Sequence, residues 1–368
     1  MHELRTGIFF IQMIASLSLE NFRNFGLLDL KFKDRSVILT GANGQGKTSV
    51  LEAIFFLANL RSFRTLKVRE MQKLGTGFFR LSCILNGGAW NTKLELENSD
   101  VRRLRIDGVP VPRASGFTGR VRTIAFLPDD SAIIGGSAIL RRRFFDMFIS
   151  MTDPNYFTAL QLYSRALKER NFLLRSPSFD PEILRSYHPI LAENGSFIMK
   201  KRREYAKMLT DSMRLIFEKI RPEFQSLSVK MRYSREIDSS EAFLRRLDTH
   251  IEYDRERGCT ACGPHLDDFD FVVNDRNLRI YGSNGQKRIA SFALKMAEFD
   301  IVGASAEQRK NTVVIVDDAT GDLDYRTKNA FFDKIHTAGQ VFFAFTDIEN
   351  NPVFNRSQII TLSSGKAV

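Results

Sequence analysis

A short run of glycines, a lysine and a threonine near the start of the chain has the spacing of a loop that binds phosphate groups. Residues 41–48 read GANGQGKT, in which the glycines let backbone N–H groups curl around an anion. Lys47 can reach the β- and γ-phosphates of a nucleotide, and the hydroxyl of Thr48 can ligate Mg²⁺. The sequence therefore predicts a site for ATP and Mg²⁺, with nucleotide contacts at Gly41, Ala42, Asn43, Gly44, Gln45, Gly46, Lys47 and Thr48.

The flanking segments suit a loop between a strand and a helix. Residues 36–40 (SVILT) form a β-branched and apolar run, and residues 47–59 place Val50, Leu51, Ile54 and Ala58 on one helical face. The start of that helix would add the positive end of its dipole to the phosphate site. For the bare pattern the alternative is an ordinary glycine turn, but strand, loop and helix together indicate a Walker A motif.

A pair of aspartates follows an apolar run far along the chain. Residues 312–316 (TVVIV) suit a buried parallel strand that delivers Asp317 and Asp318 at its C-terminal end. Such a Walker B strand would let Asp317 hold Mg²⁺ together with Thr48, while Asp318 polarises the attacking water. Lys47, Asp317 and Asp318 are therefore the predicted catalytic residues. The two motifs are much farther apart than one compact nucleotide domain requires, which predicts an insertion between them.

A third candidate lies just before the aspartate strand. Residues 281–288 read YGSNGQKR and precede an apolar-periodic helix at 289–299. Ser283, Gly285 and Gln286 offer a hydroxyl, bare backbone and helix-start N–H groups to an anion. Because the chain already has its own phosphate loop, the economical interpretation is a contact with the nucleotide of a partner subunit, as in the ATP-binding-cassette signature. An ordinary capped helix after a loop is the alternative.

These motifs belong to a longer series of segments that resembles a known family. In order they are LSLENFRNF at 17–25, GANGQGKTSVLEAIFFLA at 41–58, RSFRT at 61–65, FLPDD at 126–130, LRRRFFD at 140–146, YSRALKERNFLL at 163–174, GPHLDDF at 263–269, DDATGDLD at 317–324 and QVFFAFT at 340–346. The chain resembles the RecF family of bacterial recombinational-repair ATPases, in the structural-maintenance-of-chromosomes (SMC) branch. Leu266 stands where the family usually has arginine, Asp322 replaces a glutamate, and Lys287 is a variable position of the signature.

The resemblance implies an α/β fold, an ABC/SMC-type P-loop ATPase head with a mostly helical inserted domain. It implies a slow, DNA-stimulated ATPase that closes as an ATP-dependent homodimer on double-stranded DNA, at gaps or single-strand/double-strand junctions. RecR-like and RecO-like mediators and the RecA recombinase would be its partners. It also implies that residues 322–324 lie where the D-loop of such ATPases lies, and that His265 makes a polar contact near the nucleotide.

The overall charge favours a polyanionic partner. The 368 residues carry a formal net charge of +11, and the pI is about 9.6. Nucleic acid is the first candidate and an anionic membrane surface the second. Basic residues gather at 61–69, 102–105, 141–143 and 200–203, although such a cluster is often only a solvated face. Arg61, Arg64 and Lys67 are the preferred DNA contacts because their loop follows the phosphate-loop helix.

Cysteine usage and hydropathy point to the cytoplasm, in association with the nucleoid. The three cysteines suit a reducing compartment without a disulfide framework. Cys259, Cys262 and His265 have metal-like spacing, but a structural zinc site needs four ligands. No run approaches the roughly 20 apolar residues of a membrane helix. Residues 1–12 are predicted to be an N-terminal extension, with Met13 as the natural start.

Hydrophobic periodicity divides the chain into a strand-rich and a helical part. Short runs at 27–32, 80–85, 92–96 and 104–106 predict strands, and runs at 141–151, 154–174, 181–218 and 239–253 predict helices. The predicted domains are an ATPase head at 13–135 and 255–368 and a helical insert at 136–254. The alternatives are an ABC-type ATPase subunit of a transport or defence system, or a metabolic phosphotransferase.

Overall fold

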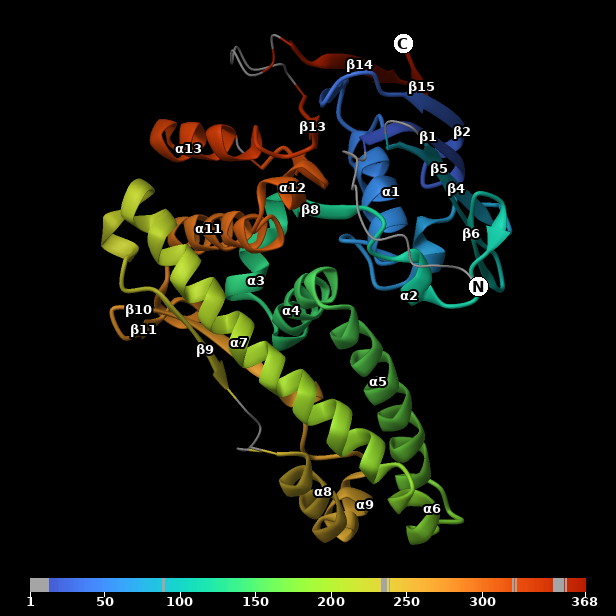
Figure 1. Ribbon diagram of the computed structural model, residues 1–368, viewed down its shortest axis with the longest axis vertical. Helices are drawn as coiled ribbons and strands as arrows, with labels where there is room; N and C mark the ends of the chain where they lie inside the picture. The colour runs from blue at the N-terminus through green and yellow to red at the C-terminus, as the bar shows by residue number, and fades with distance from the viewer. Residues whose placement is uncertain are drawn as a thin grey trace. The chain divides into compact units, whose positions relative to one another are not determined.

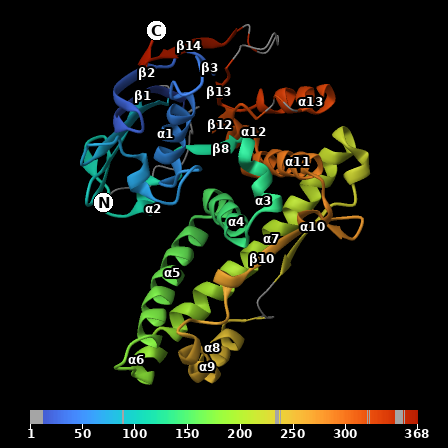
Figure 2. The ribbon, with the colours of Figure 1, turned by 180° about the vertical axis from the view of Figure 1, so that it is seen from behind.

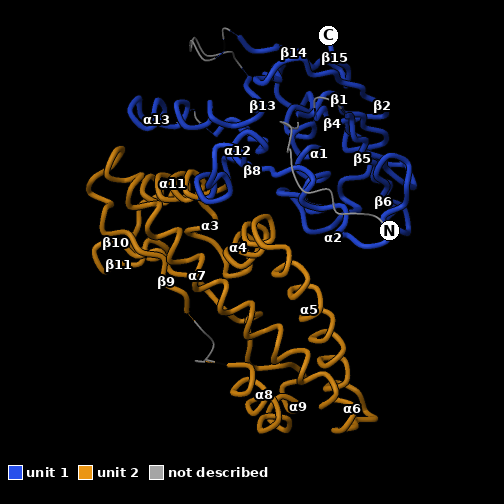
Figure 3. The backbone as a smooth tube through the Cα atoms, in the orientation of Figure 1, with its two compact units in different colours: residues 1–129, 298–368 blue, residues 130–297 orange. Residues whose placement is uncertain are grey.

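The computed structural model describes residues 13–87, 90–232, 237, 239–319, 321, 323–346, 354 and 356–368. The chain forms two compact units, one of residues 1–129 and 298–368 and the other of residues 130–297 (Figure 3). These divisions differ from the predicted domain boundaries, because the second unit includes residues 255–297. Helix α11 (Asn284–Val302) crosses the division.

One sheet of the first unit is antiparallel and follows the predicted strands. Its order is β2 (Phe25–Lys31), β1 (Met13–Phe22), β4 (Phe79–Asn86), β5 (Asn91–Asn98), β6 (Arg102–Ile106) and β7 (Val109–Pro110). Leu19, Leu81, Leu96 and Leu104 stand opposite one another across β1, β4, β5 and β6. All four are buried, so alternation of apolar and polar residues sets the register.

The other sheet of the first unit is parallel except for the edge strand β15 (Lys366–Ala367), which is antiparallel to its neighbour. Its order is β15, β14 (Gln358–Ser363), β3 (Ser36–Thr40), β13 (Gln340–Ala344), β12 (Thr312–Asp317) and β8 (Arg122–Phe126). Both faces are covered, which explains the unbroken apolar runs. Phe343 packs on Phe332 of α13 (Tyr325–Ile335), whereas its neighbour Phe342 points the other way and contacts Phe32.

Helix α1 (Lys47–Asn59) lies between the two sheets (Figures 1 and 2). It contacts β1, β4 and β5 of the antiparallel sheet and β8, β12 and β13 of the parallel sheet. Residues 49–58 are buried all round the helix, so its packing fixes the direction of its first turn. That first turn contains Lys47 and Thr48. Shorter elements of this unit are η1 (Val68–Met71), α2 (Ala114–Phe117) and α12 (Ala306–Lys310).

The second unit is mostly helical, as predicted (Figure 3). Its helices are α3 (Ser131–Gly135), α4 (Ala138–Thr152), α5 (Pro154–Leu174), α6 (Pro181–Arg185), α7 (His188–Ile220), α8 (Ser240–Thr249), α9 (Ile251–Arg257), α10 (Leu278–Tyr281) and most of α11. Helices α5 and α7 pack along each other. A small sheet, β11 (Arg276–Asn277), β10 (Asp268–Val273) and β9 (Ser228–Arg232), adds to the helices.

The prediction of one helical run over residues 181–218 was wrong in one respect. The run is divided at Ser186 and Tyr187, and α7 begins at His188 with Pro189 in its first turn. Proline is tolerated there because first-turn N–H groups have no partner inside the helix, whereas an interior proline would break a hydrogen bond and clash. Across the described residues, no helix combines the length and the apolar character needed to span a membrane.

Candidate nucleotide-binding site

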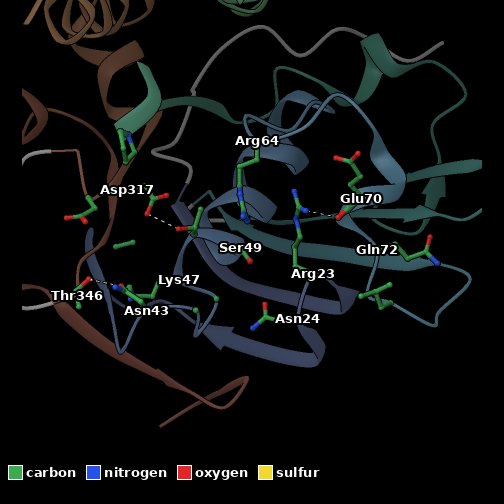
Figure 4. Close-up of a pocket in the computed structure, with 17 residues that line it drawn as sticks. Arg23, Asn24, Asn43, Lys47, Ser49, Arg64, Glu70, Gln72, Asp317 and Thr346 are labelled. Atoms are coloured by element: carbon green, nitrogen blue, oxygen red, sulfur yellow. Dashed lines mark hydrogen bonds between the residues drawn. The ribbon is translucent and has the colours of Figure 1, made fainter. Parts of the chain in front are cut away.

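A cleft of about 710 Å³ lies in the first unit, next to the C-terminal ends of β3, β13 and β12 (Figure 4). Ligands of open α/β sheets commonly bind at this edge. The cleft is lined by Arg23, Asn24, Asn43, Gly44, Gly46, Lys47, Thr48, Ser49, Arg64, Glu70, Gln72, Leu74, Pro128, Asp317, Asp318, Ala344 and Thr346. Lys47, Thr48, Asp317 and Asp318 come from both sequence motifs, so the fold brings the predicted catalytic residues together.

The glycines that begin and end the phosphate loop are required by close backbone packing. Gly41 has φ +137°, and a Cβ there would lie 2.3 Å from the carbonyl oxygen of Leu362. Gly46 has φ +98°, and a Cβ there would lie 2.4 Å from the ring of Phe25. Any larger residue at either place would push the loop away from its neighbours. The buried Lys47 crosses the loop, with Nζ donating to the carbonyl oxygens of Gly41 at 2.6 Å and Ala42 at 3.0 Å.

The hydroxyl of Thr48 and the carboxylate of Asp317 form a direct pair across the cleft. Thr48 Oγ1 donates to Asp317 Oδ1 at 3.1 Å. Burial raises the pKa of Asp317, and the hydrogen bond from Thr48 opposes that effect. Asp318 is exposed and has φ +48°, and its N–H donates to the carbonyl of Ala344 at 3.1 Å. Aspartate is one of the few residues that adopts this left-handed conformation readily.

Two polar side chains of the loop are held by distant segments of the chain. Asn43 Oδ1 accepts from Thr346 Oγ1 at 3.2 Å, and Gln45 Oε1 accepts from the backbone N–H of Ser364 at 2.6 Å. The side chain of Gln45 therefore contacts the turn between the two C-terminal strands of the unit. Its predicted nucleotide contact would have to come from its backbone.

The cleft also contains residues that motif reasoning missed, and a buried glutamate organises them. Glu52 of α1 is completely buried and accepts from Arg23 Nε at 2.8 Å and Nη2 at 2.6 Å. It also accepts from the hydroxyl of Ser62 and lies 3.5 Å from Arg64 Nη1. Arg23 Nη1 in turn donates to the carbonyl of Glu70 at 2.6 Å. Glu52 thereby ties the helix of the phosphate loop to the basic segment 61–70.

The only signal for Arg23 and Asn24 was that they fall within the family-like segment at 17–25, whereas Arg64 was predicted, but as a DNA contact. The structure places Arg64 in the cleft, where its charge opposes the rise in the pKa of Asp317 that burial causes. Arg61 is half-buried in the same segment, and the side chain of Lys67 is 81% exposed and lies 3.7 Å from Glu70.

The signature residues form a capping box at the start of α11. Ser283 Oγ accepts from the N–H of Gln286 at 3.2 Å, and Gln286 Oε1 accepts from the N–H of Ser283 at 2.9 Å. Ser283, Gly285 and Gln286 are exposed and belong to the second unit, whereas the cleft is lined by residues of the first. Asp324 caps α13 by accepting from the N–H of Thr327 at 3.1 Å, and Asp322 falls outside the described residues.

Most of the other basic clusters are occupied by structural contacts. Arg102 lies over the ring of Phe56 at 5.5 Å, and Arg103 pairs with Glu97 at 2.7 Å. The fully buried Arg141 pairs with Asp268 at 2.6 Å, and the buried Arg202 pairs with Asp146 at 2.7 Å and Asp267 at 2.9 Å. Burial, opposed by Arg202, raises the pKa of Asp267 to about 6. The buried Arg141 and Arg202 therefore cannot contact DNA, whereas Arg103 is exposed.

The residues with metal-like spacing are engaged inside the second unit. His265 Nδ1 lies 2.7 Å from the hydroxyl of Tyr163, and Nε2 lies 2.9 Å from the carbonyl oxygen of Thr260. Both ring nitrogens of His265 therefore have partners within the second unit, and its polar contact near the nucleotide stays a prediction. Burial raises the pKa of Cys262 to about 11, so its thiol stays protonated at neutral pH. Leu266 is partly exposed at the usually basic position.

Three features together define the class of this protein. They are the glycine loop after β3, the two aspartates at the end of β12 and the helical unit inserted between them in the chain. The fold is that of an ABC/SMC-type P-loop ATPase head, which confirms the predicted fold class. A family model described as an AAA domain matches residues 16–171.

Known proteins place the chain within that class. It is 32% identical to the DNA replication and repair protein RecF of Leptospira interrogans, with 96% of this chain and 98% of the relative covered. It is 31% identical to that of Ruminiclostridium cellulolyticum, with 92% and 94% covered. The chain therefore belongs to the RecF family of DNA replication and repair proteins, as the sequence indicated.

Solved structures agree with this assignment. Two are described as the recombination mediator protein RecF in the RecFOR pathway, one with ATP and one with ATPrS. The first matches with a TM-score of 0.86 at 26% identity, over 100% of this chain and 99% of that chain. The second matches with a TM-score of 0.84 at 27% identity, over 97% of each.

Proposed function

We propose that this chain is an ATP-dependent DNA-binding protein of recombinational repair. It binds gapped DNA or single-strand/double-strand junctions as a homodimer closed around ATP, and it helps to load a recombinase. The observation that carries the proposal is the division of the motifs: Walker A and Walker B share one cleft, while the exposed signature at Ser283 lies outside its lining. A second copy of the chain could supply that signature.

The family membership supports the remaining elements of this function. The relatives are DNA replication and repair proteins, and the similar solved structures are assigned to the RecFOR pathway. The corresponding partners are RecR-like and RecO-like mediators and a RecA-like recombinase. The place of action is the cytoplasm, in association with the nucleoid. These relatives favour repair over a transport or defence ATPase.

The chemistry of the site fits Mg²⁺. Thr48 Oγ1 and Asp317 Oδ1 are oxygen atoms only 3.1 Å apart, and Mg²⁺ in phosphate sites takes one or two such protein ligands together with phosphates and waters. Bound there, the ion would neutralise charge on the β- and γ-phosphates. Lys47 would move from the loop carbonyls to the phosphates, and Asp318 would orient the attacking water and accept its proton.

The buried position of Asp317 predicts that Mg²⁺ promotes ATP binding less at low pH. Its pKa is raised, so it takes up a proton at a higher pH than an exposed aspartate with a pKa of about 3.9. The protonated form is a poor ligand for the ion. We expect the ratio of ATP affinity in Mg²⁺ to that in EDTA to fall from about pH 7.5 to about pH 5.

Calorimetric titration of wild-type protein and Asp317→Asn would measure this ratio. The variant cannot titrate at this position, so it gives the contribution of ATP's own protonation. Identical pH profiles in both proteins would show that Asp317 is not the ligand.

The DNA surface is assigned to the segment that follows α1. Arg61 and Lys67 remain candidates for phosphate contacts, whereas Arg141 and Arg202 of the other clusters are buried in ion pairs. Arg64 lines the nucleotide cleft, so removing it should weaken nucleotide binding as well as any binding of DNA. We therefore add a nucleotide contact to the DNA contact predicted for Arg64.

Salt titrations test this surface. Each phosphate contact releases counterions, so Arg61→Ala and Lys67→Ala should each lower the slope of log affinity against log salt by about one. Affinity for ATP should not change. Arg103→Ala is the matched control because Arg103 already pairs with Glu97 at 2.7 Å. A wild-type slope in the Arg61 and Lys67 variants would place the DNA elsewhere on the protein.

The function as a whole can be tested by measuring ATP hydrolysis and oligomeric state with and without gapped DNA. We expect slow turnover, a monomer without nucleotide, a dimer with ATP, and faster hydrolysis when gapped DNA is added. Hydrolysis that ignores DNA, by a protein that stays monomeric with ATP, would contradict the proposal.

A further inference from the structure

The hairpin formed by β14 and β15 lies directly beside the phosphate loop, although over 300 residues separate them in the chain. Strand β14 pairs in parallel with β3, and Thr361 stands opposite Thr40, the last residue before the loop. The carbonyl oxygen of Leu362 occupies the space that a side chain on Gly41 would need. The first residue of the phosphate loop is therefore packed against the backbone of β14.

The turn of this hairpin is tight. Ser364 has φ +48° and Gly365 has φ +75°, and they join strands in which Ser363 pairs with Lys366. Two left-handed residues in a two-residue loop are the form of a type I′ turn, whose twist matches that of the flanking strands. Its strands hold the N–H of Ser364 in one place, from which it donates to Gln45 Oε1 at 2.6 Å.

The loop is also held at its other end. The ring of Phe25 packs on Gly46, and a Cβ on Gly365 of the hairpin turn would lie 4.0 Å from the same ring. The hairpin, Phe25 and the phosphate loop thus form one packed layer within the first unit. The hydrogen bond from Ser364 to Gln45 links the hairpin to the middle of the phosphate loop.

We propose that the hairpin of residues 358–368 is a positioning element of the nucleotide site and that it acts through the Ser364–Gln45 hydrogen bond. The bond keeps the loop curled before the nucleotide arrives, so binding does not have to order it. Holding a binding loop in its bound form raises affinity by removing that entropic cost. Gln45 and Ser364 are positioning residues, and the inference rests on the proposed binding of ATP by residues 41–48.

The test is a double-mutant cycle on ATP affinity. Gln45→Met removes the acceptor at similar length, and Ser364→Pro removes the N–H donor. Each should weaken ATP and ADP binding by about three- to tenfold, the worth of one ordinary hydrogen bond. The double variant should be no weaker than the single variants, because both changes remove the same bond. Ser364→Gly keeps the N–H and suits a positive φ, so it should rescue the affinity lost in Ser364→Pro.

Controls separate this effect from general damage. Gln161→Met changes an exposed glutamine of α5 in the same way and should leave affinity unchanged. Melting temperatures without nucleotide should fall by only about 2–4 °C in Gln45→Met, as expected for one lost hydrogen bond in a folded protein. Since proline does not suit φ +48°, Ser364→Pro could disturb the turn, so amide exchange of Ser364 gives a second measurement. That exchange should quicken in Gln45→Met while the β14 amides stay protected.

Wild-type affinity in Gln45→Met, or losses that multiply in the double variant, would overturn the positioning role. Unchanged Ser364 exchange in Gln45→Met would do the same. Failure of the wild-type protein to bind ATP would instead overturn the proposed function, so the two failures are distinguishable.

Discussion

Replacing Lys47 with methionine is expected to abolish ATP-dependent dimerisation and ATP-dependent DNA binding while the protein stays folded. The ammonium group provides charge-assisted hydrogen bonds to the β- and γ-phosphates, each worth about 1.5–3 kcal/mol. Losing two of them should weaken ATP binding by at least about a hundredfold. Without nucleotide, Nζ contacts the carbonyls of Gly41 and Ala42, which water can solvate instead because both residues are at least partly exposed.

Equilibrium titration with ATP and size-exclusion chromatography would measure these losses, with Lys33→Met as the control. Lys33 is an exposed lysine outside the cleft, so its replacement removes the same charge without touching the site. Unchanged ATP-driven dimerisation in a folded Lys47→Met protein would mean that residues 41–48 are not the nucleotide site.

Substitutions at Ser283 and Asp318 should have opposite effects on the dimer. Ser283→Arg adds bulk and charge at the proposed closing surface, so it should permit ATP binding but block dimer formation and hydrolysis. Asp318→Asn keeps the shape, and asparagine tolerates φ +48°, but the group that accepts a proton from water is lost. Hydrolysis should slow by about a hundredfold or more, which should trap an ATP-bound dimer with DNA affinity at or above wild type.

The capping role of Ser283 requires a matched control, and the chain contains one. Ser305 and Gln308 form the same capping box at the start of α12, with hydrogen bonds of 3.0 and 3.1 Å. Losing such a cap costs about 1 kcal/mol of stability. Ser305→Arg should therefore show the cost of the cap alone and still dimerise with ATP. If Ser283→Arg dimerises as well as Ser305→Arg does, the signature of one chain does not complete the nucleotide site of the other.

A mixture of the two variants tests whether the contacts cross between chains. In a heterodimer, one nucleotide site would combine the intact Asp318 of one chain with the intact Ser283 of the other. Some hydrolysis should return on mixing, although each variant alone hydrolyses ATP very slowly or not at all. Mixing without recovery would indicate that signature and phosphate loop act within a single chain.

The nucleotide motifs could be read from the sequence because their chemistry is local. Glycine spacing, a lysine and a threonine define the phosphate loop within residues 41–48, and the apolar run 312–316 needs burial on both faces whatever surrounds it. The pairing of Thr48 with Asp317 then follows from placing two parallel strands in one sheet. The same locality explains why the signature was ambiguous: Ser283 and Gln286 form a complete capping box by themselves.

The sequence by itself determined the class of the protein and its family, and it predicted the phosphate loop at residues 41–48. Only the tertiary structure decided which basic side chains are exposed and which are buried in ion pairs. Arg141 and Arg202 look like surface cations in the sequence, yet both are buried against aspartates. Likewise, nothing near Gln45 in the chain predicts its contact with Ser364. Periodicity reports the local face of a helix or strand, whereas hydrogen bonds and ion pairs depend on which distant segments the fold brings within about 3 Å.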